Sequence, residues 1–386
     1  MLQGVNVALG VTGSIAAVRV VEFVHELRRQ GATVRAVMSE SATNIIHPWA
    51  VEFATERDVV TDLTGAVEHV ELCGVDGWAD VLLIAPATAN TVGKMAGAID
   101  DTPVTTCATT ALGAGVPVVV APAMHEPMYD HPGVLESIEK LESWDVGFVD
   151  PRVEEGKAKI ASDEAIATDV ARAVGDQPLT DKHVVVTSGA TTESIDPIRT
   201  LSNRASGTTG REVARACYVR GADVTLVHDG PDVPYATVER VESAAEMLAA
   251  VEDTISEADA LVSAAAISDY TVDTVQEKIR SGQEALTLEL QRVPKLLDTV
   301  RDANPELQMV GFKAETSGDD AAMVERAQQL QERVDLAFVV ANDASVMGED
   351  ETRALLVDGS GDPEEVRGEK AALGGAVADT LAAVFE

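Results

Sequence analysis

The stretch VEHVELCGVDGWADVLLIAPATANT, residues 67–91, decides how this chain folds. Residues 81–85 form an apolar run of strand length, typical of a buried strand. A small, hydroxyl-rich turn at residues 86–91 follows the run, and His69 precedes it. Because ligands bind at the carboxyl ends of strands in open parallel sheets, we expect a catalytic site with His69 beside this turn. An ordinary structural histidine is the alternative interpretation.

The length and composition limit the class of protein. A chain of 386 residues predicts two domains, and 46% hydrophobic content with only 3% aromatics predicts cores of Val, Ala, Leu and Ile. The widely spaced Cys73, Cys107 and Cys217 argue against a disulfide framework or a zinc site. With neither a signal peptide at the N-terminus nor an apolar run of ~18 residues, we expect a cytoplasmic protein and no membrane partner.

The net charge of −36 comes from 65 acidic and 29 basic residues. A nucleic-acid-binding protein needs a basic surface, and the chain has no basic run, so nucleic acid is not expected as a partner. The acidic residues are spread over the whole length. Their repulsion is screened in molar salt, which predicts a halophilic protein; a merely acidic mesophilic enzyme is the alternative.

Strands alternate with helices along the chain. In the first half, strands are expected at 5–9, 33–38, 81–85 and 117–121, and helices at 14–30, 90–97, 102–112 and 163–174. In the second half, strands are expected at 183–187, 223–228, 260–264, 309–312 and 336–340, and helices at 208–220, 244–256, 319–333 and 370–385. This alternation predicts an α/β fold with two doubly wound parallel-sheet, Rossmann-like domains. The polar linker at 175–181 (GDQPLTD) separates domains 1–176 and 181–386.

Polar side chains follow several of the expected strands in the first half. Gly13 and Ser14 lie where a strand meets a helix, and the backbone N–H groups there favour an anion. Further hydroxyl and amide groups lie near other strand ends: Ser39, Thr43, Thr88, Asn90 and Thr106. Such loops suit a phosphorylated aromatic cofactor such as FMN. Ordinary turn and capping chemistry is the alternative for any one of them.

The second half carries a long loop, TSGATTESIDPIRTLSNRASGTTGRE, at residues 187–212. Its arginines, Arg199, Arg204 and Arg211, could neutralise a polyphosphate together with the next helix N-terminus. The alternative is local pairing with the acidic residues of the same loop, Glu193, Asp196 and Glu212.

Two further residues of the second half suggest catalysis. Asp269 follows a strand, and Lys278 comes nine residues later. An isolated lysine can stabilise a developing charge; a plain surface lysine is the alternative. Residues 311–316 and 341–343 also follow strands and would line the same crevice. The GxGxxG and GxxxxGK[ST] fingerprints are absent from the sequence, so a dehydrogenase or a P-loop protein is not supported.

The motifs resemble those of the bifunctional coenzyme A biosynthesis family, which fuses phosphopantothenoylcysteine decarboxylase to phosphopantothenate–cysteine ligase. The resemblance runs from about residue 5 to residue 358. In the first half it rests on LGVTGSIAA, EHVEL, WADVLLIAPATANT and PAMHEPMY, and in the second on the loop at 187–210.

For the first half, the resemblance implies a flavodoxin-like flavoprotein that decarboxylates 4'-phosphopantothenoylcysteine to 4'-phosphopantetheine with bound FMN. It also implies trimer-based homo-oligomers with sites between subunits. His69 matches the active-site base, and His125 and Met128 lie in the substrate motif, with His125 where relatives often have Asn. The substrate flap has no cysteine, which leaves Lys157, Lys159 or water as the final proton donor.

For the second half, the resemblance implies a ligase, typically dimeric, that joins 4'-phosphopantothenate to cysteine through an acyl-CMP intermediate, using CTP and Mg²⁺. Asn203 matches the acyl-cytidylate contact, Lys278 the catalytic lysine, and Arg199 and Arg204 the substrate contacts. The implied CTP contacts are Ser263, Ala264, Ala265, Asp269, Lys278, Pro294, Lys295, Leu296, Leu297 and Phe312. The implied metal ligands are Asp269 and Asp343. Arg326 and Arg333 stand where relatives have two lysines.

Three other functions compete with this one. A flavin-dependent peptidyl-cysteine decarboxylase would not need the second half. An FMN-binding regulatory subunit would not need His69. A short-chain oxidoreductase needs a Tyr-x-x-x-Lys pair, which neither Tyr235 nor Tyr270 provides.

Overall fold

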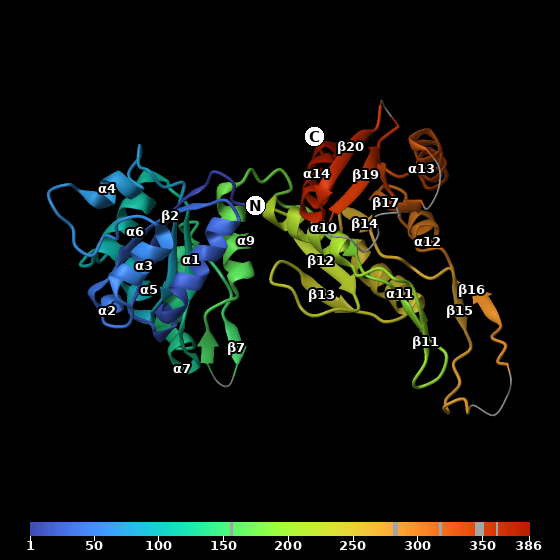
Figure 1. The fold of residues 1–386 in the computed structure, drawn as a ribbon, viewed down its shortest axis with the longest axis horizontal. Helices are drawn as coiled ribbons and strands as arrows, with labels where there is room; N and C mark the ends of the chain where they lie inside the picture. Colours follow the sequence, from blue (N-terminus) through green and yellow to red (C-terminus); the bar gives the residue numbers. More distant parts are fainter. Residues whose placement is uncertain (155–156, 281–284, 316–318, 344–350, 360–361) are drawn as a thin grey trace. The chain divides into compact units, whose positions relative to one another are not determined.

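A computed structural model describes residues 1–154, 157–280, 285–315, 319–343, 351–359 and 362–386. The chain divides into two compact units, Met1–Asp176 and Gln177–Glu386 (Figure 1). Among the described helices, none is long and apolar enough to cross a membrane.

Unit 1 is built on a five-stranded parallel sheet with the order β2-β1-β3-β4-β6. Its strands are β1 (Asn6–Val11), β2 (Thr33–Met38), β3 (Val81–Ala87), β4 (Val118–Pro122) and β6 (Gly147–Phe148). Every residue of β3 is buried, as its apolar sequence predicts for a central strand. The order is that of flavodoxin-like folds, whose switch point lies between β1 and β3. The structure therefore confirms the fold predicted for the first half.

Helices cover both faces of this sheet. One face carries the 3-10 helix η1 (Ile15–Arg19), α1 (Val20–Arg29), α3 (Pro48–Thr55) and α9 (Asp163–Val174). The other carries α4 (Glu68–Cys73), α5 (Ala89–Ala96), α6 (Pro103–Ala114) and α8 (Pro132–Glu142). The helix expected at 14–30 is divided into η1 and α1, and Ser14 caps it as predicted by accepting from the Ala16 N–H.

Short elements gather after β2 and β4. Helix α2 (Glu40–Thr43) follows β2 directly, and α7 (Glu126–Tyr129) follows β5 (Met124–His125). β5 pairs with β8 (Lys157–Lys159), which pairs with β7 (Arg152–Glu154). This small antiparallel sheet joins the segment after β4 to the predicted substrate flap.

Unit 2 contains an eight-stranded sheet with the order β13-β12-β9-β14-β17-β18-β19-β20. Its strands are β9 (His183–Thr187), β12 (Asp223–His228), β13 (Thr237–Arg240), β14 (Ala260–Ser263), β17 (Gln308–Glu315), β18 (Phe338–Asp343), β19 (Glu351–Val357) and β20 (Glu364–Glu369). The first six are parallel, and five of them were predicted; β13 was not, and β19 and β20 add an antiparallel edge that the sequence did not predict either. Mixed sheets of this kind are common in doubly wound folds.

Two helical layers enclose this sheet. On one face lie α10 (Thr208–Val219) and α14 (Lys370–Val384); on the other lie α11 (Ala244–Thr254), the 3-10 helix η2 (Ile255–Glu257), α12 (Leu296–Ala303) and α13 (Asp320–Val334). A separate core, mostly Val, Leu and Ala, fills each layer.

Two hairpins complete unit 2. β10 (Thr192–Ser194) pairs with β11 (Thr200–Ser202), and β15 (Tyr270–Val272) pairs with β16 (Leu290–Arg292). β15 and β16 form an arm that projects from the body of unit 2 (Figure 1).

Candidate active sites

Hydrogen bonds of hydroxyl groups link the carboxyl ends of the central strands of unit 1. The Thr12 Oγ1 donates to the Pro86 carbonyl at 2.7 Å and accepts from the Thr88 N–H at 3.2 Å. The Ser14 Oγ donates to the Ala123 carbonyl at 2.9 Å. The segments after β1, β3 and β4 thus form one edge, where a flavodoxin-like fold binds its ligand.

At this edge Gly13 lies in close contact with Ser41, an approach that we call the Gly13 cradle. A Cβ atom at Gly13 would come within 2.5 Å of the Ser41 Oγ and 2.6 Å of its Cβ. Ser39 caps α2 by accepting from the Ala42 N–H at 3.3 Å, and its hydroxyl lies 3.0 Å from that of Ser41. The structure therefore brings Gly13, Ser14, Ser39 and the end of β3 to one place.

The remaining predicted cofactor residues lie on the helices around this edge. Thr88 caps α5, and Asn90 is exposed in the first turn of that helix. The Thr43 hydroxyl donates within α2 to the Glu40 carbonyl at 2.8 Å. The Thr106 hydroxyl donates to the Thr102 carbonyl at 2.9 Å, so it already serves the α6 N-terminus.

His69 lies away from this edge, which corrects the expected placement beside the turn at 86–91. Its helix, α4, precedes β3, and the Ala79 N–H donates to the Leu72 carbonyl at 2.9 Å. The Asp80 carboxylate accepts from the Asn6 N–H at the start of β1. Figure 1 shows α4 at the end of unit 1 opposite α2, α5 and α7. The seven residues of β3 separate the two places by roughly 23 Å.

The surroundings of His69 are unusual for a structural histidine. The side chain is half-buried, and its Nδ1 is buried with no hydrogen-bond partner in the described part of the chain. Apolar side chains next to it are exposed: Val67 (50%), Val70 (49%) and Val75 (83%). His69 thus combines an unpaired ring nitrogen with exposed apolar side chains nearby in the sequence, among the described residues.

The two departures from the family pattern meet in the small antiparallel sheet. His125 of β5 lies directly opposite Lys157 of β8. The side chain of Lys157 is outside the described part of the structure. Met128 follows on α7 and is 48% exposed. His125 and Met128 are therefore accessible on the segment that the flap contacts.

In unit 2, the loop after β9 packs on the N-terminus of α10. The Ser188 Oγ donates to the Gly207 carbonyl at 2.7 Å. Gly207 adopts φ +73°, and a Cβ at Gly210 would come within 2.6 Å of the Ser188 Cβ. Only glycine permits this approach. The N–H groups of the first turn of α10 thus lie by the carboxyl end of β9, an arrangement that suits a phosphate.

Asn203 lies at the end of β14. Its Nδ2 donates to the Ala266 carbonyl at 2.8 Å, while the Ala265 N–H donates to the Thr187 hydroxyl at 3.3 Å. Ser263 pairs in register with Gly311, one residue before Phe312 on β17. Asn203 and the predicted CTP residues 263–265 and Phe312 therefore share one edge of the sheet.

The segment before α12 contributes more of the predicted CTP residues. Lys295 forms an ion pair with Asp269, with both side chains exposed, and the Val293 N–H donates to the Asp269 carbonyl at 3.1 Å. Pro294 lies between these contacts. Leu296 begins α12 and is buried, and Leu297 packs beside Gly311.

The predicted metal ligands are only partly described. Asp343 ends β18, and its side chain lies outside the described part; Asp269 is paired with Lys295. Within the described residues, no three His, Cys, Asp or Glu side chains form a group that could hold a metal ion.

The basic residues of unit 2 differ in their environments. The Arg199 guanidinium pairs with the buried Asp196, as in the alternative of local pairing. Arg204 is exposed beside Asn203, and Lys278 is exposed between β15 and β16. On the helix layer, Arg333 of α13 pairs with Asp298 of α12. Arg204 and Lys278 are thus accessible cations among the predicted site residues, as is Lys295.

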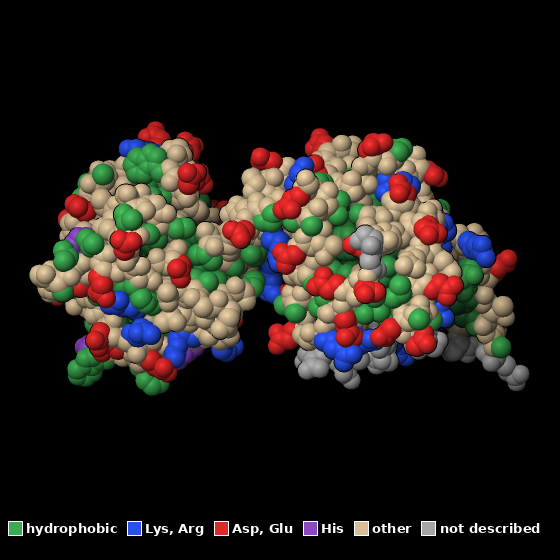
Figure 2. Space-filling view, turned by 90° about the horizontal axis from the view of Figure 1, so that it is seen from above, with side chains coloured by type: hydrophobic (Ala, Val, Ile, Leu, Met, Phe, Trp, Pro, Cys, Tyr) green, Lys and Arg blue, Asp and Glu red, His purple; other side chains and the backbone are tan. Residues whose placement is uncertain are grey.

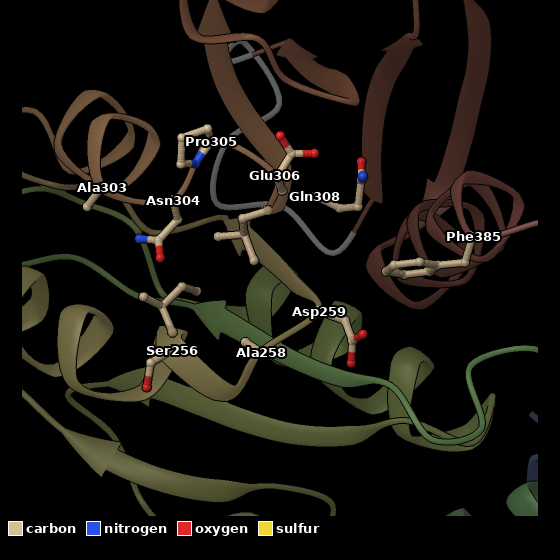
Figure 3. Close-up of a pocket in the computed structure, with 11 residues that line it drawn as sticks. Ser256, Ala258, Asp259, Ala303, Asn304, Pro305, Glu306, Gln308 and Phe385 are labelled. Atoms are coloured by element: carbon tan, nitrogen blue, oxygen red, sulfur yellow. The ribbon is translucent and has the colours of Figure 1, made fainter.

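An open cavity of about 490 Å³ lies at the opposite, amino edge of the unit 2 sheet. Figure 3 shows Asp259, Asn304, Glu306 and Phe385 among the side chains around it. None of the predicted site residues lines this cavity, so it does not belong to the predicted chemistry.

Comparisons with known proteins identify both units. Residues 1–175 match the flavoprotein family, and residues 179–384 match the family described as DNA/pantothenate metabolism flavoprotein C-terminal domain. The coenzyme A biosynthesis bifunctional protein CoaBC of Thermococcus kodakarensis is 48% identical over 362 residues, covering 92% of this chain and 89% of that protein. The CoaBC of Bacillus subtilis is 34% identical over 368 residues, covering 90% and 88%.

A solved C-terminal domain of CoaBC is 26% identical, covers 54% of this chain and 98% of that one, and has a TM-score of 0.47. The two family matches and the long relatives confirm the resemblance carried by the motifs. The chain belongs to the family of bifunctional coenzyme A biosynthesis proteins, enzymes that combine a phosphopantothenoylcysteine decarboxylase with a phosphopantothenate–cysteine ligase.

Proposed function

We propose that unit 2 ligates cysteine to 4'-phosphopantothenate with CTP and that unit 1 decarboxylates the product to 4'-phosphopantetheine. The observation that supports this best is that each of two compact units gathers polar side chains at the carboxyl edge of its own parallel strands. A peptidyl-cysteine decarboxylase or a regulatory flavoprotein would leave the polar side chains of the second unit, including Asn203 and Asp269, without a role.

The ligation begins when the carboxylate of 4'-phosphopantothenate attacks the α-phosphate of CTP, forming acyl-CMP and releasing pyrophosphate. The amine of cysteine then attacks the acyl carbon, CMP leaves, and the nitrogen loses a proton. We assign Asn203 to the acyl-CMP and Lys278 to the charge that develops during these transfers. Residues 263–265 and 294–297 with Phe312 hold the nucleotide, and Arg204 binds the substrate with Arg199 beside it.

Mg²⁺ fits this site if it binds together with the triphosphate of the nucleotide. Mg²⁺ is usually bound by one or two carboxylates together with substrate phosphates. Asp269 is exposed and paired with Lys295 across a solvent-accessible contact, which a triphosphate can replace. We therefore assign Asp269, and with it Asp343, to the metal that enters with CTP.

The carboxyl edge of the unit 1 sheet fits FMN. Gly13 has no side chain between the end of β1 and Ser41, where a Cβ atom would clash, and hydroxyl groups at the ends of β1, β2 and β3 can hydrogen-bond a phosphate and a ribityl chain. Gly13, Ser14, Ser39 and Thr88 would hold the group, with Thr43, Asn90 and Thr106 on the surrounding helices. Bound FMN supplies a reversible acceptor for the electron pair of the cysteinyl thiol. His125 and Met128 hold the substrate beside it.

Proton transfer in unit 1 is assigned to His69 and Lys157. The His69 imidazole takes a proton from the cysteinyl group, and Lys157 on the flap returns one to the product. His69 is on α4, which lies at the end of unit 1 opposite α2, α5 and α7, so we infer that it acts on the cradle of a second copy of the chain. We propose that unit 1 assembles as a trimer and unit 2 as a dimer. The oligomer would cover exposed apolar side chains of unit 1, including Ile15, Val18, Trp49 and Phe53.

The three cysteines are buried and free, which supports a reducing compartment, and we propose the cytoplasm.

The test of the proposed function is a product assay by mass spectrometry in molar KCl, with Mg²⁺, 4'-phosphopantothenate, cysteine and CTP. The expected products are 4'-phosphopantetheine, CMP and pyrophosphate. Phosphopantothenoylcysteine as the end product would remove the unit 1 assignment. No product from a folded, yellow protein would favour the regulatory alternative. Replacing CTP with ATP tests the nucleotide.

A further inference from the structure

Lys278 lies outside the main sheet of unit 2, on the chain between β15 and β16. The side chain is exposed, and the arm formed by these strands projects from the body of the unit (Figure 1). A catalytic lysine must be held at a fixed place, because a displacement of about 1 Å can cost ~10²-fold in rate. The structure must therefore fix this segment from outside the arm.

The loop between β10 and β11 provides the attachment. The Thr274 hydroxyl donates to the Ser194 carbonyl at 2.8 Å, and the Val275 N–H donates to the Ile195 carbonyl at 3.0 Å. Next to Lys278, both backbone groups of Ile279 are bound. Its N–H donates to the Asp196 Oδ2 at 3.1 Å, and its carbonyl accepts from the Arg199 Nη1 at 3.1 Å.

Asp196 is a buried carboxylate that forms part of these contacts. Its side chain has no exposed surface. The Oδ1 accepts from the N–H groups of Ile198 and Arg199, each at 2.8 Å, and the Oδ2 accepts from the Arg199 guanidinium and Ile279. Burial opposes ionisation, but these donors outweigh it and lower the pKa of Asp196 to about 2. The carboxylate is therefore charged near neutral pH.

A second buried carboxylate holds the base of the arm. The Glu193 Oε2 accepts from the Thr271 hydroxyl at 2.7 Å, and its Oε1 accepts from the Ala244 N–H at 2.9 Å. Glu193 thus ties the arm to the first turn of α11, while Asp196 ties it beside Lys278. Residues 193–199 therefore bind this segment at four residues, Thr271, Thr274, Val275 and Ile279.

We propose that Asp196 and Arg199 are a positioning pair for the ligase reaction: by fixing the backbone of Ile279, they set the place of Lys278 relative to Asn203 and Asp269. The proposal rests on the proposed role of Lys278. It explains why the predicted substrate residue Arg199 is bound to a buried carboxylate. Asp196 and Arg199 act through Lys278 and need not touch the substrate.

The first test is Asp196→Asn. The amide has the shape of the carboxylate, but its NH₂ group would face the donors that now bind either Oδ1 or Oδ2. We expect the ligase kcat to fall ~10- to 100-fold, with little change in the KM for CTP. Decarboxylation of supplied phosphopantothenoylcysteine should stay at the wild-type rate. The matched control is Asp259→Asn. Asp259 also accepts from a backbone N–H group, that of His183, and from a basic side chain, that of Lys182. It differs in lying at the amino edge of the sheet. Ligation should be unchanged in this control.

The decisive test is a double-mutant cycle with Lys278→Ala. If Asp196 acts through Lys278, then Asp196→Asn causes no further loss in the Lys278→Ala background. Multiplying losses would overturn the proposal, because they would mean a general structural role. Arg199→Lys is the second variant if Asp196→Asn does not fold, and it should show a smaller loss with the same non-additivity. Full ligation by Lys278→Ala would instead remove the assignment of Lys278, and with it the proposed function of that residue.

Discussion

The two units have the same layered architecture but differ in how their candidate residues are distributed. In unit 2, residues from the β9 loop, the end of β14 and the start of α12 meet at one edge of the sheet. In unit 1, the Gly13 cradle lies at the carboxyl edge, while His69 lies on a helix at the other end. The carboxyl edge of a parallel sheet therefore gathers the loops that follow its strands, whereas His69, which precedes β3, lies outside that edge.

The largest effect is expected from His69→Asn. An amide cannot act as the base, so decarboxylation should fall by at least ~10²-fold, while ligation in unit 2 continues at the wild-type rate. Release of CO₂ from supplied phosphopantothenoylcysteine measures the first activity, and pyrophosphate release measures the second. Normal CO₂ release by this variant would contradict the assignment of the base.

A complementation experiment tests the comparison itself. Gly13→Leu should block the cradle, because even a Cβ atom meets Ser41 at 2.5 Å, and the variant should lose bound flavin. If sites form between copies, co-expressed Gly13→Leu and His69→Asn chains regain part of the activity that each lacks alone. Persistent inactivity of folded mixed oligomers would mean that each unit 1 completes its own site.

Lys278→Gln should have the next largest effect. The substitution removes the charge and shortens the side chain by one atom, so ligation should fall ~10²- to 10³-fold, with decarboxylation unaffected. Mass spectrometry of the reaction should show either acyl-CMP accumulating or no nucleotide turnover. Loss of both activities would indicate a folding defect instead, which thermal unfolding of the variant would detect.

The fold could be predicted where buried apolar runs end in glycines and capping residues. The bounds expected for β2, β9, β12 and α9 agree with the structure. The antiparallel edge could not, because β20 (EEVRGE) is charged and largely exposed, with no apolar alternation. Helix α4, six residues long, was also missed, and this is why His69 was expected at the wrong end of β3.

The candidate sites were predictable to the extent that they depend on topology. Hydroxyl groups after different strands were expected to meet because carboxyl ends of parallel strands share an edge. The contact between Asp196 and Ile279 joins residues 83 positions apart and leaves no local pattern in the sequence. The nearest signal was the spacing of Asp196 and Arg199 in SIDPIR, which indicated a local pair but not its backbone partner.

A moderate effect is expected from salt, and it should be the same in both units. Acidic side chains are spread over both units on the face seen in Figure 2, and the net charge is −36. The screening length falls from about 10 Å at 0.1 M to about 3 Å at 1 M salt. We expect the unfolding temperature of each unit to rise on the order of 10 °C over this range. Sucrose, which does not screen charge, is the control. Stabilisation of one unit alone would contradict the prediction that salt acts equally on both units.

The smallest effect should separate the units by pH. Of the seven histidines, all within the described residues, only His228 of unit 2 is fully buried, at 1% exposed. Its ring lies tightly under Gly230, where a Cβ atom would come within 2.5 Å of the Cε1. Burial is the main cause that lowers the pKa of His228 below its usual value, and the nearby Arg211 adds to it.

The sign of the pH effect is set by this shift. As pH falls below about 6.5, the unfolded chain takes up a proton at His228 that the folded unit still refuses, so folding becomes less favourable until the lowered pKa is reached. Calorimetry at pH 7.5 and 5.5 in molar KCl should show that unit 2 of the wild-type protein loses more stability than unit 2 of the His228→Gln variant. The variant lacks this linkage because glutamine does not titrate. Equal pH dependence in both proteins would mean that other groups carry the acid sensitivity of unit 2, and that the buried imidazole does not distinguish it from unit 1.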